Sequence, residues 1–268
     1  MTNNSEIGII ILDIFSEKHL EKCLQQIPES LRSNVFVSSN TNNTSQKENN
    51  QLYVKSLSTK VNGFKFEREC SFASMRNRGI MFFRNLKIKY LFFLNSNCLV
   101  EDERFFDFTI QKASVFGTWF MTGPSHKENT FPVEDVDSGL TLSVSPELNT
   151  SVMFMLASIV KNCGYFVEQF YATDVIDVLD YTKKLFKLNI YPPHPFNPII
   201  DYGLKFESAE LTTPQYPDFE KHLNHTFGYF QHLHGYVPGH NDPPGHTKDQ
   251  MFSAMEKIQK IFAKPYEK

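Results

Sequence analysis

Ile7-Gly8-Ile9-Ile10-Ile11-Leu12-Asp13-Ile14 is a nearly continuous run of β-branched residues close to the start of the chain. Such a run is typical of a strand that is buried on both faces, as in a parallel sheet. Apolar residues then recur at helical spacing from Leu20 to Ile27, after a possible N-cap at Ser16, which predicts an amphipathic helix. The chain therefore opens with a strand followed by a helix.

Strands and helices continue to alternate outward from this opening pair. Strands are predicted at 34–38, 52–57 and 90–94, with a polar loop at 39–50 and a helix that carries an apolar stripe from Met75 to Leu86. This order predicts an α/β fold with a mostly parallel, doubly wound sheet flanked by helices. Ligands of such sheets bind beyond the carboxyl ends of the strands.

The second half of the chain gives a less regular pattern. We expect a strand at 115–122, a polar loop at 125–143, a helix at 152–160 ended by Gly164, a helix from near Asp174 and a short strand at 189–191. Residues 214–246 are rich in Pro, His and aromatic side chains without a clear period, and 249–264 closes the chain as an amphipathic helix. We divide the chain into a catalytic domain, 1–213, and a C-terminal helical or irregular extension, 214–268.

Composition excludes several classes of protein. The formal net charge of −3 gives no overall basic face, so a nucleic acid partner is not expected. The four cysteines form no Cys-x-x-Cys pair, which argues against a zinc ribbon or a disulfide framework and favours buried thiols. No secretory signal is visible, and no apolar run approaches the roughly 20 residues that span a bilayer. We therefore expect a cytoplasmic protein.

Three segments, in this order, resemble family 2 glycosyltransferases. Residues 72–80 (FASMRNRGI) are similar to that family's aARNxGi helix, and 90–97 (YLFFLNSN) occupy the place of the strand that ends in its Asp-x-Asp motif. Residues 164–177 are similar to the GgFdE.ff.yEDvDl segment, which opens the helix that bears the catalytic base. The resemblance covers roughly residues 7–205 and implies the GT-A fold of the nucleotide-diphospho-sugar transferases.

The resemblance also implies a reaction. A sugar would move, with inversion in that family's manner, from a nucleotide-diphosphate sugar to a hydroxyl of a glycan, lipid-linked or protein acceptor. Asp174 matches the carboxylate that acts as general base on the acceptor hydroxyl. It lies at a predicted helix N-terminus, where the helix dipole favours the ionised form. Local sequence alone also allows Asp174 to be an N-cap, with Asp177 as an ordinary acid of the first turn.

The donor site is implied at the strand ends and on the neighbouring helix. Arg76 and Asn77 belong to the helix motif, and Asn95 and Asn97 replace the two carboxylates of Asp-x-Asp. Asp13 and Asn40 follow other strands and are expected near the nucleotide. The donor-site residues implied by the resemblance are Asp13, Asn40, Arg76, Asn77, Asn95 and Asn97.

The Asn95-Ser96-Asn97 turn changes what is expected of a metal. Asparagine carbonyls are neutral, so Mn²⁺ or Mg²⁺ would bind more weakly than on Asp-x-Asp. Asn97 and His194 are the weak candidates for metal ligands. Two interpretations follow: an enzyme that works with little or no metal, or a degenerate GT-A-like protein that binds or scaffolds without turnover. A nucleotidyltransferase is disfavoured because no glycine-rich phosphate loop is present.

The histidines of the extension do not follow a known metal-binding spacing. They include His222, His225, His232 and His234, interleaved with aromatic residues. Such side chains either stack on sugar rings or pack the extension onto the domain. The closing helix at 249–264 is expected to pack on its own domain or on a second copy of the chain, which would give a homo-oligomer, rather than on a membrane.

Overall fold

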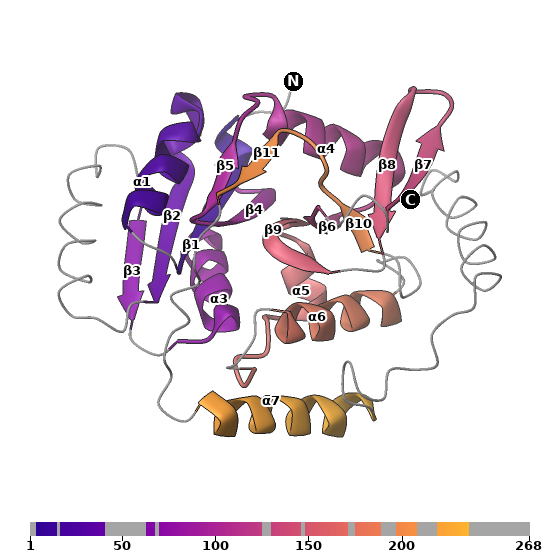
Figure 1. Ribbon diagram of the computed structural model, residues 1–268. Coiled ribbons are helices and arrows are strands. Elements are labelled where there is room, and N and C mark those ends of the chain that lie inside the picture. Colours follow the sequence, from indigo (N-terminus) through magenta and orange to yellow (C-terminus); the bar gives the residue numbers. More distant parts are fainter. Residues whose placement is uncertain are drawn as a thin grey trace.

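The computed structural model describes residues 4–14, 17–40, 63–67, 70–124, 130–145, 148–170, 175–188, 197–207 and 219–235. Its main feature is one nine-stranded sheet (Figure 1). The strands of this sheet are β1 (Ile7–Asp13), β2 (Val35–Asn40), β3 (Gly63–Glu67), β4 (Tyr90–Asn95), β6 (Phe120–Gly123), β7 (Phe131–Asp135), β8 (Leu140–Ser145), β9 (Asn149–Leu156) and β10 (Asn197–Ile199). A second, two-stranded sheet pairs β5 (Cys98–Val100) with β11 (Leu204–Phe206).

The strands lie in the order β3-β2-β1-β4-β9-β6-β10-β8-β7. β1 pairs in parallel with both β2 and β4, β2 pairs in parallel with β3, and β10 pairs in parallel with β6. β9 is antiparallel to β4 and β6, and β8 is antiparallel to β10 and β7. Only β8 and β9 of these strands therefore run against the others, and the predicted mostly parallel α/β sheet is confirmed.

Helices cover both faces of the sheet. They are α1 (Glu17–Gln26), α3 (Phe72–Phe83), α4 (Phe105–Phe116), α5 (Ile159–Cys163), α6 (Ile176–Lys187) and α7 (Phe219–His234), with 3₁₀ helices η1 (Asn4–Glu6) and η2 (Glu29–Asn34). The core contacts place α1 and α4 on one face and α3, α5 and α6 on the other. α7 lies outside α6 and forms the lower margin of the molecule in Figure 1.

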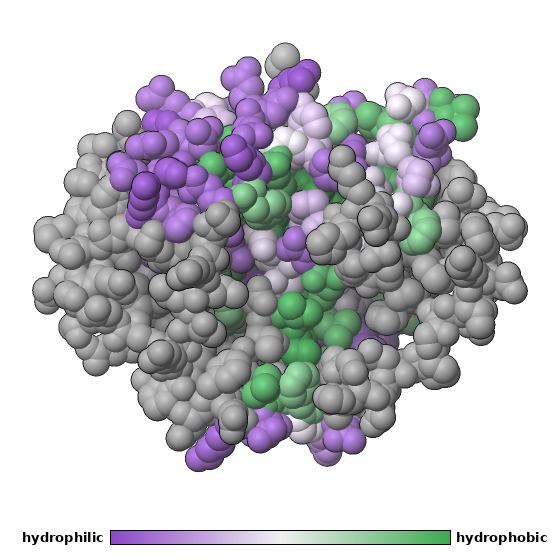
Figure 2. Space-filling view, in the orientation of Figure 1, coloured by the Kyte–Doolittle hydropathy of each residue, from purple (hydrophilic) through white to green (hydrophobic). Residues whose placement is uncertain are grey.

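Successive residues of the central strands enter different cores. Ile9 and Ile11 of β1 pack with α1 and α4, whereas Ile10 and Leu12 pack with α3 and α6. Every residue of β1 is buried, which is why its sequence shows no polar alternation. The outer side of α1 is hydrophilic, and the surface over this helix is correspondingly polar (Figure 2).

Helix α3 lies unusually close to β1. A Cβ atom at Gly79 would lie 2.5 Å from side-chain atoms of Ile10, a distance that carbon atoms do not tolerate. The helix is capped by Ser71, whose hydroxyl accepts a hydrogen bond from the Ser74 N–H at 3.1 Å. The glycine of the helix motif therefore serves close packing between helix and sheet.

Three predictions for the second half were wrong. The strand expected at 115–122 combines the end of α4, which Gly117 closes at φ 62°, with the start of β6. The loop expected at 125–143 contains the β7–β8 hairpin. The helix expected at 152–160 is β9 followed by the short α5, because a strand buried on both faces carries apolar residues that also match helical spacing.

The described part of the extension is helical. Residues 219–234, expected to have no regular period, form α7, whose Phe230 is buried against Phe170 and Ile176. The strands expected at 52–57 and 189–191 and the helix expected at 249–264 lie outside the described residues.

Two general expectations can be compared with the described residues. Cys23, Cys70 and Cys98 are buried thiols and Cys163 is partly buried, all without a disulfide bond. None of the described helices is long and apolar enough to cross a lipid bilayer.

Candidate functional site

The carboxyl ends of β1, β2 and β4 meet at one edge of the sheet. In the parallel register Leu12 pairs with Asn95 and Asp13 pairs with Ser39. Three of the residues predicted from the sequence therefore belong to one place: Asp13, Asn95 and, through the turn after β4, Asn97. Asn40 is the last residue of β2 and belongs to the same edge. We call this group the strand-end cluster: Asp13, Ser38, Ser39, Asn95, Ser96 and Asn97.

Asp13 is held by the neighbouring strand. Its side chain is buried, and its Oδ2 accepts a hydrogen bond from the Ser39 hydroxyl at 2.7 Å. Cys23 of α1 lies close enough for the carboxylate to act on it. Burial, with a contribution from the negative charge of Asp13, raises the pKa of the Cys23 thiol to about 12. This thiol is therefore protonated at neutral pH and is no nucleophile.

Four further members of the strand-end cluster carry buried side-chain oxygen atoms for which the described residues supply no hydrogen-bond partner. Among the described residues no hydrogen bond reaches the Ser38 Oγ, the Asn95 Oδ1, the Ser96 Oγ or the Asn97 Oδ1. A buried acceptor without a hydrogen bond costs about 1–3 kcal/mol, and native proteins contain few of them. Four at one sheet edge indicate a surface that a ligand completes.

The turn after β4 is fixed from the outside by the second sheet. The Glu207 N–H donates to the Asn97 carbonyl oxygen at 3.0 Å, and Asn97 Nδ2 donates to the Glu207 carbonyl oxygen at 3.2 Å. The Glu207 carboxylate in turn pairs with Lys22 of α1. These contacts hold the amide of Asn97 in place, and its Oδ1 accepts no hydrogen bond from a described residue.

A second polar group lies between α3 and α6. Arg76 and Asp177 form an ion pair, Nη1 to Oδ2 at 2.5 Å, and neither side chain has any exposed surface. The guanidinium also lies 5.7 Å from the ring centres of both Phe72 and Phe166, within the range of a cation–π contact. The guanidinium stays charged at this depth because its partner carboxylate, buried beside it, compensates the charge.

Asn77 binds the segment that precedes α6. Its Oδ1 accepts a hydrogen bond from the Phe166 N–H at 2.9 Å, and its Nδ2 donates to the Phe166 carbonyl and to Glu168 Oε1, each at 2.9 Å. The Phe166 ring stacks on Tyr181 of α6 with centres 4.2 Å apart. We call Arg76, Asn77, Phe166 and Asp177 the interhelix network.

The interhelix network differs from the sequence-based picture of its members. Arg76 and Asn77 were expected to line the donor site, and their described polar contacts run to α6 and to the Phe166 segment; their place in the donor site stays a prediction. Asp177, which local sequence alone allowed as an ordinary acid of the first turn, lies in the first turn of α6 and is fully buried against Arg76. Both members of this pair stand in segments that the sequence singled out, Arg76 in the helix motif and Asp177 at the start of α6. Because 101 positions separate them in the chain, the sequence did not predict that they pair.

Two predicted site residues lie outside the described residues: Asp174, the expected base, and His194, the weak metal candidate. Asp174 stands two positions before α6 in the chain. Of Asn40 the structure describes the backbone, which pairs with Glu67 of β3. The roles of all three stay predictions.

The strand-end cluster offers little to a divalent cation. Among the described residues, no three His, Cys, Asp or Glu side chains are grouped in a way that could hold a metal ion. Asp13 supplies one carboxylate, and Asn95 and Asn97 supply neutral oxygens. Hard cations bind most tightly to sets with several carboxylates, so these residues do not fit a tightly held Mn²⁺ or Mg²⁺. No part of the proposed reaction is therefore assigned to a metal ion.

Comparison with known proteins gives a match in structure alone. The sequence matches no model of a known protein family, and no curated protein is significantly similar to it. GalNAc-T7, solved with UDP, GalNAc and Mn²⁺, superposes with a TM-score of 0.53 at 10% identity, over 96% of this chain and 55% of that one. Mannosyltransferase PcManGT from Pyrobaculum calidifontis, solved with GDP-Man and Mn²⁺, gives 0.50 at 11% identity, over 98% and 70%.

The chain has the GT-A fold. TarS from S. aureus gives the same result, with a TM-score of 0.50 at 11% identity over 96% of this chain and 49% of that one. The GT-A fold predicted from the sequence is thereby confirmed. Identities this low show the shared architecture and no more.

Proposed function

We propose that the protein is a family 2-like glycosyltransferase. It moves a sugar from a nucleotide-diphosphate donor to a hydroxyl of a glycan, lipid-linked or protein acceptor, with inversion at the sugar carbon. Asp174 acts as general base, and the strand-end cluster, with Asn40, binds the donor.

The strand-end cluster is the observation that carries this proposal. It puts buried oxygen atoms without described partners at the carboxyl edge of a GT-A sheet, where α/β proteins bind ligands. The hydroxyls of a nucleotide ribose and of a sugar are donors that satisfy such acceptors. The solved structure of PcManGT contains the nucleotide sugar GDP-Man, and that of GalNAc-T7 contains the nucleotide UDP and the sugar GalNAc.

The chemistry makes two demands on the residues. The nucleotide diphosphate leaves with negative charge, which needs nearby cations or N–H donors. The acceptor hydroxyl needs a positioned base. The interhelix network supports the second demand, because the Arg76–Asp177 pair anchors the first turn of α6, and Asp174 precedes that turn. Asp177 itself is committed to Arg76 and is not offered as the base.

Three further statements belong to the proposal. The catalytic domain comprises 1–213 and the extension comprises 214–268. The extension mediates a homo-oligomer through residues 249–264. The protein works in the cytoplasm without a nucleic acid partner, and any Mn²⁺ or Mg²⁺ is bound weakly.

Donor binding is the first test. UDP- and GDP-sugars are screened for thermal stabilisation of the full chain in EDTA and in Mn²⁺. A donor at about 100 times its Kd adds about 2.7 kcal/mol to the free energy of unfolding. If no nucleotide sugar stabilises the protein in either condition, the chain is a non-catalytic GT-A-like scaffold and the proposal fails.

The base is tested with the variant Asp174→Asn. Loss of general-base assistance lowers the transfer rate by roughly 10²–10⁴-fold, while donor affinity stays unchanged. Asp107→Asn is the matched control, since Asp107 is an exposed acid in the first turn of α4. If Asp174→Asn keeps more than about half of the wild-type rate, the base lies elsewhere.

A further inference from the structure

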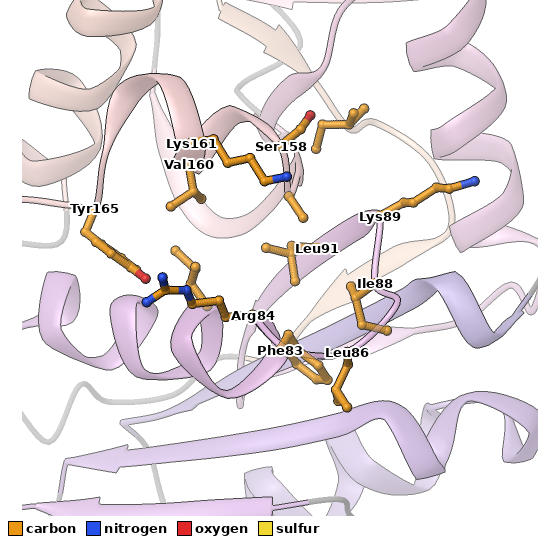
Figure 3. Close-up of a pocket in the computed structure, with 13 residues that line it drawn as sticks. Phe83, Arg84, Leu86, Ile88, Lys89, Leu91, Ser158, Val160, Lys161 and Tyr165 are labelled. Atoms are coloured by element: carbon orange, nitrogen blue, oxygen red, sulfur yellow. The ribbon is translucent and has the colours of Figure 1, made fainter.

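A cavity of about 580 Å³ opens at the edge of the sheet opposite the strand-end cluster. It is lined by the end of α3 and the segment after it, by the first residues of β4, and by the end of β9 with α5 (Figure 3). Its volume is in the range of cavities that bind small molecules. Leu91 lines it near the amino end of β4, whereas Asn95 ends the same strand, so about 13 Å of strand separates the two sites.

The floor and walls of the cavity are apolar. Ile80, Phe83 and Leu91 are buried beneath it, and Ile88 and Val160 form its sides. Leu86 stays 43% exposed at its margin. Apolar surface left in contact with water is costly at about 25 cal/mol per Å², and a concave patch of it marks a binding site more often than a scattered residue does.

The margin of the cavity is cationic. Arg84, Lys89 and Lys161 line it, and none of the aspartates and glutamates that the structure describes does. Lys89 pairs with Glu6 at 2.6 Å and points away from the cavity in Figure 3. Arg84 and Lys161 make no ion pair with any residue in the described ranges, and in Figure 3 the Arg84 guanidinium and the Tyr165 hydroxyl point toward each other.

We propose that this cavity binds a small anionic amphiphile, that is, an apolar body ending in a carboxylate, phosphate or sulfonate. The apolar body covers Ile80, Phe83 and Leu91, and the anionic head lies between Arg84 and Lys161 with the Tyr165 hydroxyl as a hydrogen-bond donor. Charge complementarity decides the class of ligand. Two cationic side chains over an apolar floor, with no described carboxylate beside them, attract an anion, repel a cationic ligand and give a neutral molecule no electrostatic gain. The site does not depend on the proposed transferase activity.

Fluorescence titration of the full chain with 8-anilinonaphthalene-1-sulfonate tests the site. We expect saturable binding of one molecule per chain, with displacement by dodecanoate below its micellar concentration. Dodecan-1-ol has the same chain without the charge and should displace the probe at least about tenfold less well. A saturating nucleotide sugar should leave the titration unchanged, so failure here and failure of the donor screen are separate results.

Two variants and one control locate the binding. Arg84→Gln/Lys161→Gln, at exposed positions, should weaken binding of both anions by about tenfold. Leu86→Glu should weaken it by repulsion at the margin. Lys18→Gln/Lys221→Gln removes the same charge from exposed positions elsewhere and should change the affinity by less than about twofold.

Several results would overturn the proposal. They are equal displacement by dodecanoate and dodecan-1-ol, an equal loss of affinity in the Lys18→Gln/Lys221→Gln control, and no saturable binding of the probe. Binding to vesicles of anionic phospholipid without binding of dodecanoate would assign the cations to a membrane surface, which also contradicts a small-molecule site.

Discussion

The strand-end cluster and the interhelix network are both polar and both buried, yet they differ in how far described residues supply their hydrogen-bond partners. The side chains of Arg76, Asn77 and Asp177 form hydrogen bonds or an ion pair with other protein groups, at donor–acceptor distances of 2.5–2.9 Å. The buried side-chain oxygens of Asn95 and Asn97 accept no hydrogen bond from any described residue.

This difference separates architecture from binding. A buried network of paired groups resists change, because removing one partner leaves the other buried without its hydrogen bond or counter-charge. A cluster with open acceptors costs stability in the absence of a ligand and recovers it on binding. Stability and affinity should therefore respond in opposite ways to substitutions in the two groups.

The largest effect is expected in the interhelix network. Arg76→Met leaves the Asp177 carboxylate buried without its cation and should lower the free energy of unfolding by about 3–5 kcal/mol. Urea denaturation measures this loss. Arg104→Met is the control, because the Arg104–Asp102 pair is exposed and should cost less than about 1 kcal/mol. A loss below 1 kcal/mol for Arg76→Met would mean that the network is no anchor.

The next effect concerns the metal. Mn²⁺ should change the donor Kd of the wild type by less than about tenfold, because Asn95 and Asn97 bring no charge. Asn95→Asp/Asn97→Asp restores two carboxylates and should make Mn²⁺ tighten the donor by about a hundredfold, or 2.7 kcal/mol. Isothermal titration in EDTA and in Mn²⁺ compares the two proteins. A hundredfold response in the wild type would show a carboxylate ligand outside the strand-end cluster.

A smaller effect of opposite sign is expected at Asn95. Asn95→Leu removes a buried carbonyl without a described partner and keeps the branching of the side chain, so the ligand-free protein should become more stable by about 1 kcal/mol. Donor affinity should fall at the same time. Destabilisation by more than 1 kcal/mol would mean that the Asn95 side chain makes stabilising contacts in the ligand-free protein. The proposed difference between the two groups would then be wrong.

The smallest effect is expected at His234, at the end of α7. Burial lowers the pKa of His234, although its hydrogen bond to Asp180 acts against this, while Lys183 and Lys187 add to the lowering. Below pH about 6.5 the unfolded chain therefore takes up the proton first, and the free energy of unfolding should decrease as the pH falls from 6.5, by less than about 1 kcal/mol.

Urea denaturation at pH 7.5 and pH 5.5 measures this loss. His234→Gln should reduce the difference between the two pH values, and His232→Gln, at an exposed position, should not. An unchanged difference in His234→Gln would assign the pH dependence to other groups.

The sequence predicted β1, α1, β2, α3 and β4, but neither β3 nor α4. The runs at 7–14 and 90–94 have no polar alternation, and the structure buries both strands on two faces in the mostly parallel sheet. The helix motif at 72–80 also lies where it was expected, with Gly79 against β1. These elements follow one another as strand, helix and strand, so local pattern and topology agree.

The second half could not be predicted in the same way. The strand β9 lies between β4 and β6 and is apolar from Val152 to Leu156, so these residues fit a helix equally well. Within the site, strand order predicted that Asp13 and Asn95 would meet, since carboxyl ends of parallel strands share an edge. The pair Arg76–Asp177 depends on how α6 packs on α3, which no local pattern records.

The position of β9 has a consequence for synthesis on the ribosome. β4 is made with its apolar run Tyr90–Leu94, and the edge that later receives β9 stays unpaired until Asn149–Leu156 emerge, about fifty residues and roughly 3–10 s of translation later. During that interval the nascent chain presents an open, phenylalanine-rich strand edge of the kind that pairs with other chains. Chaperone capture of the growing polypeptide is therefore expected to concentrate between the emergence of β4 and that of β9.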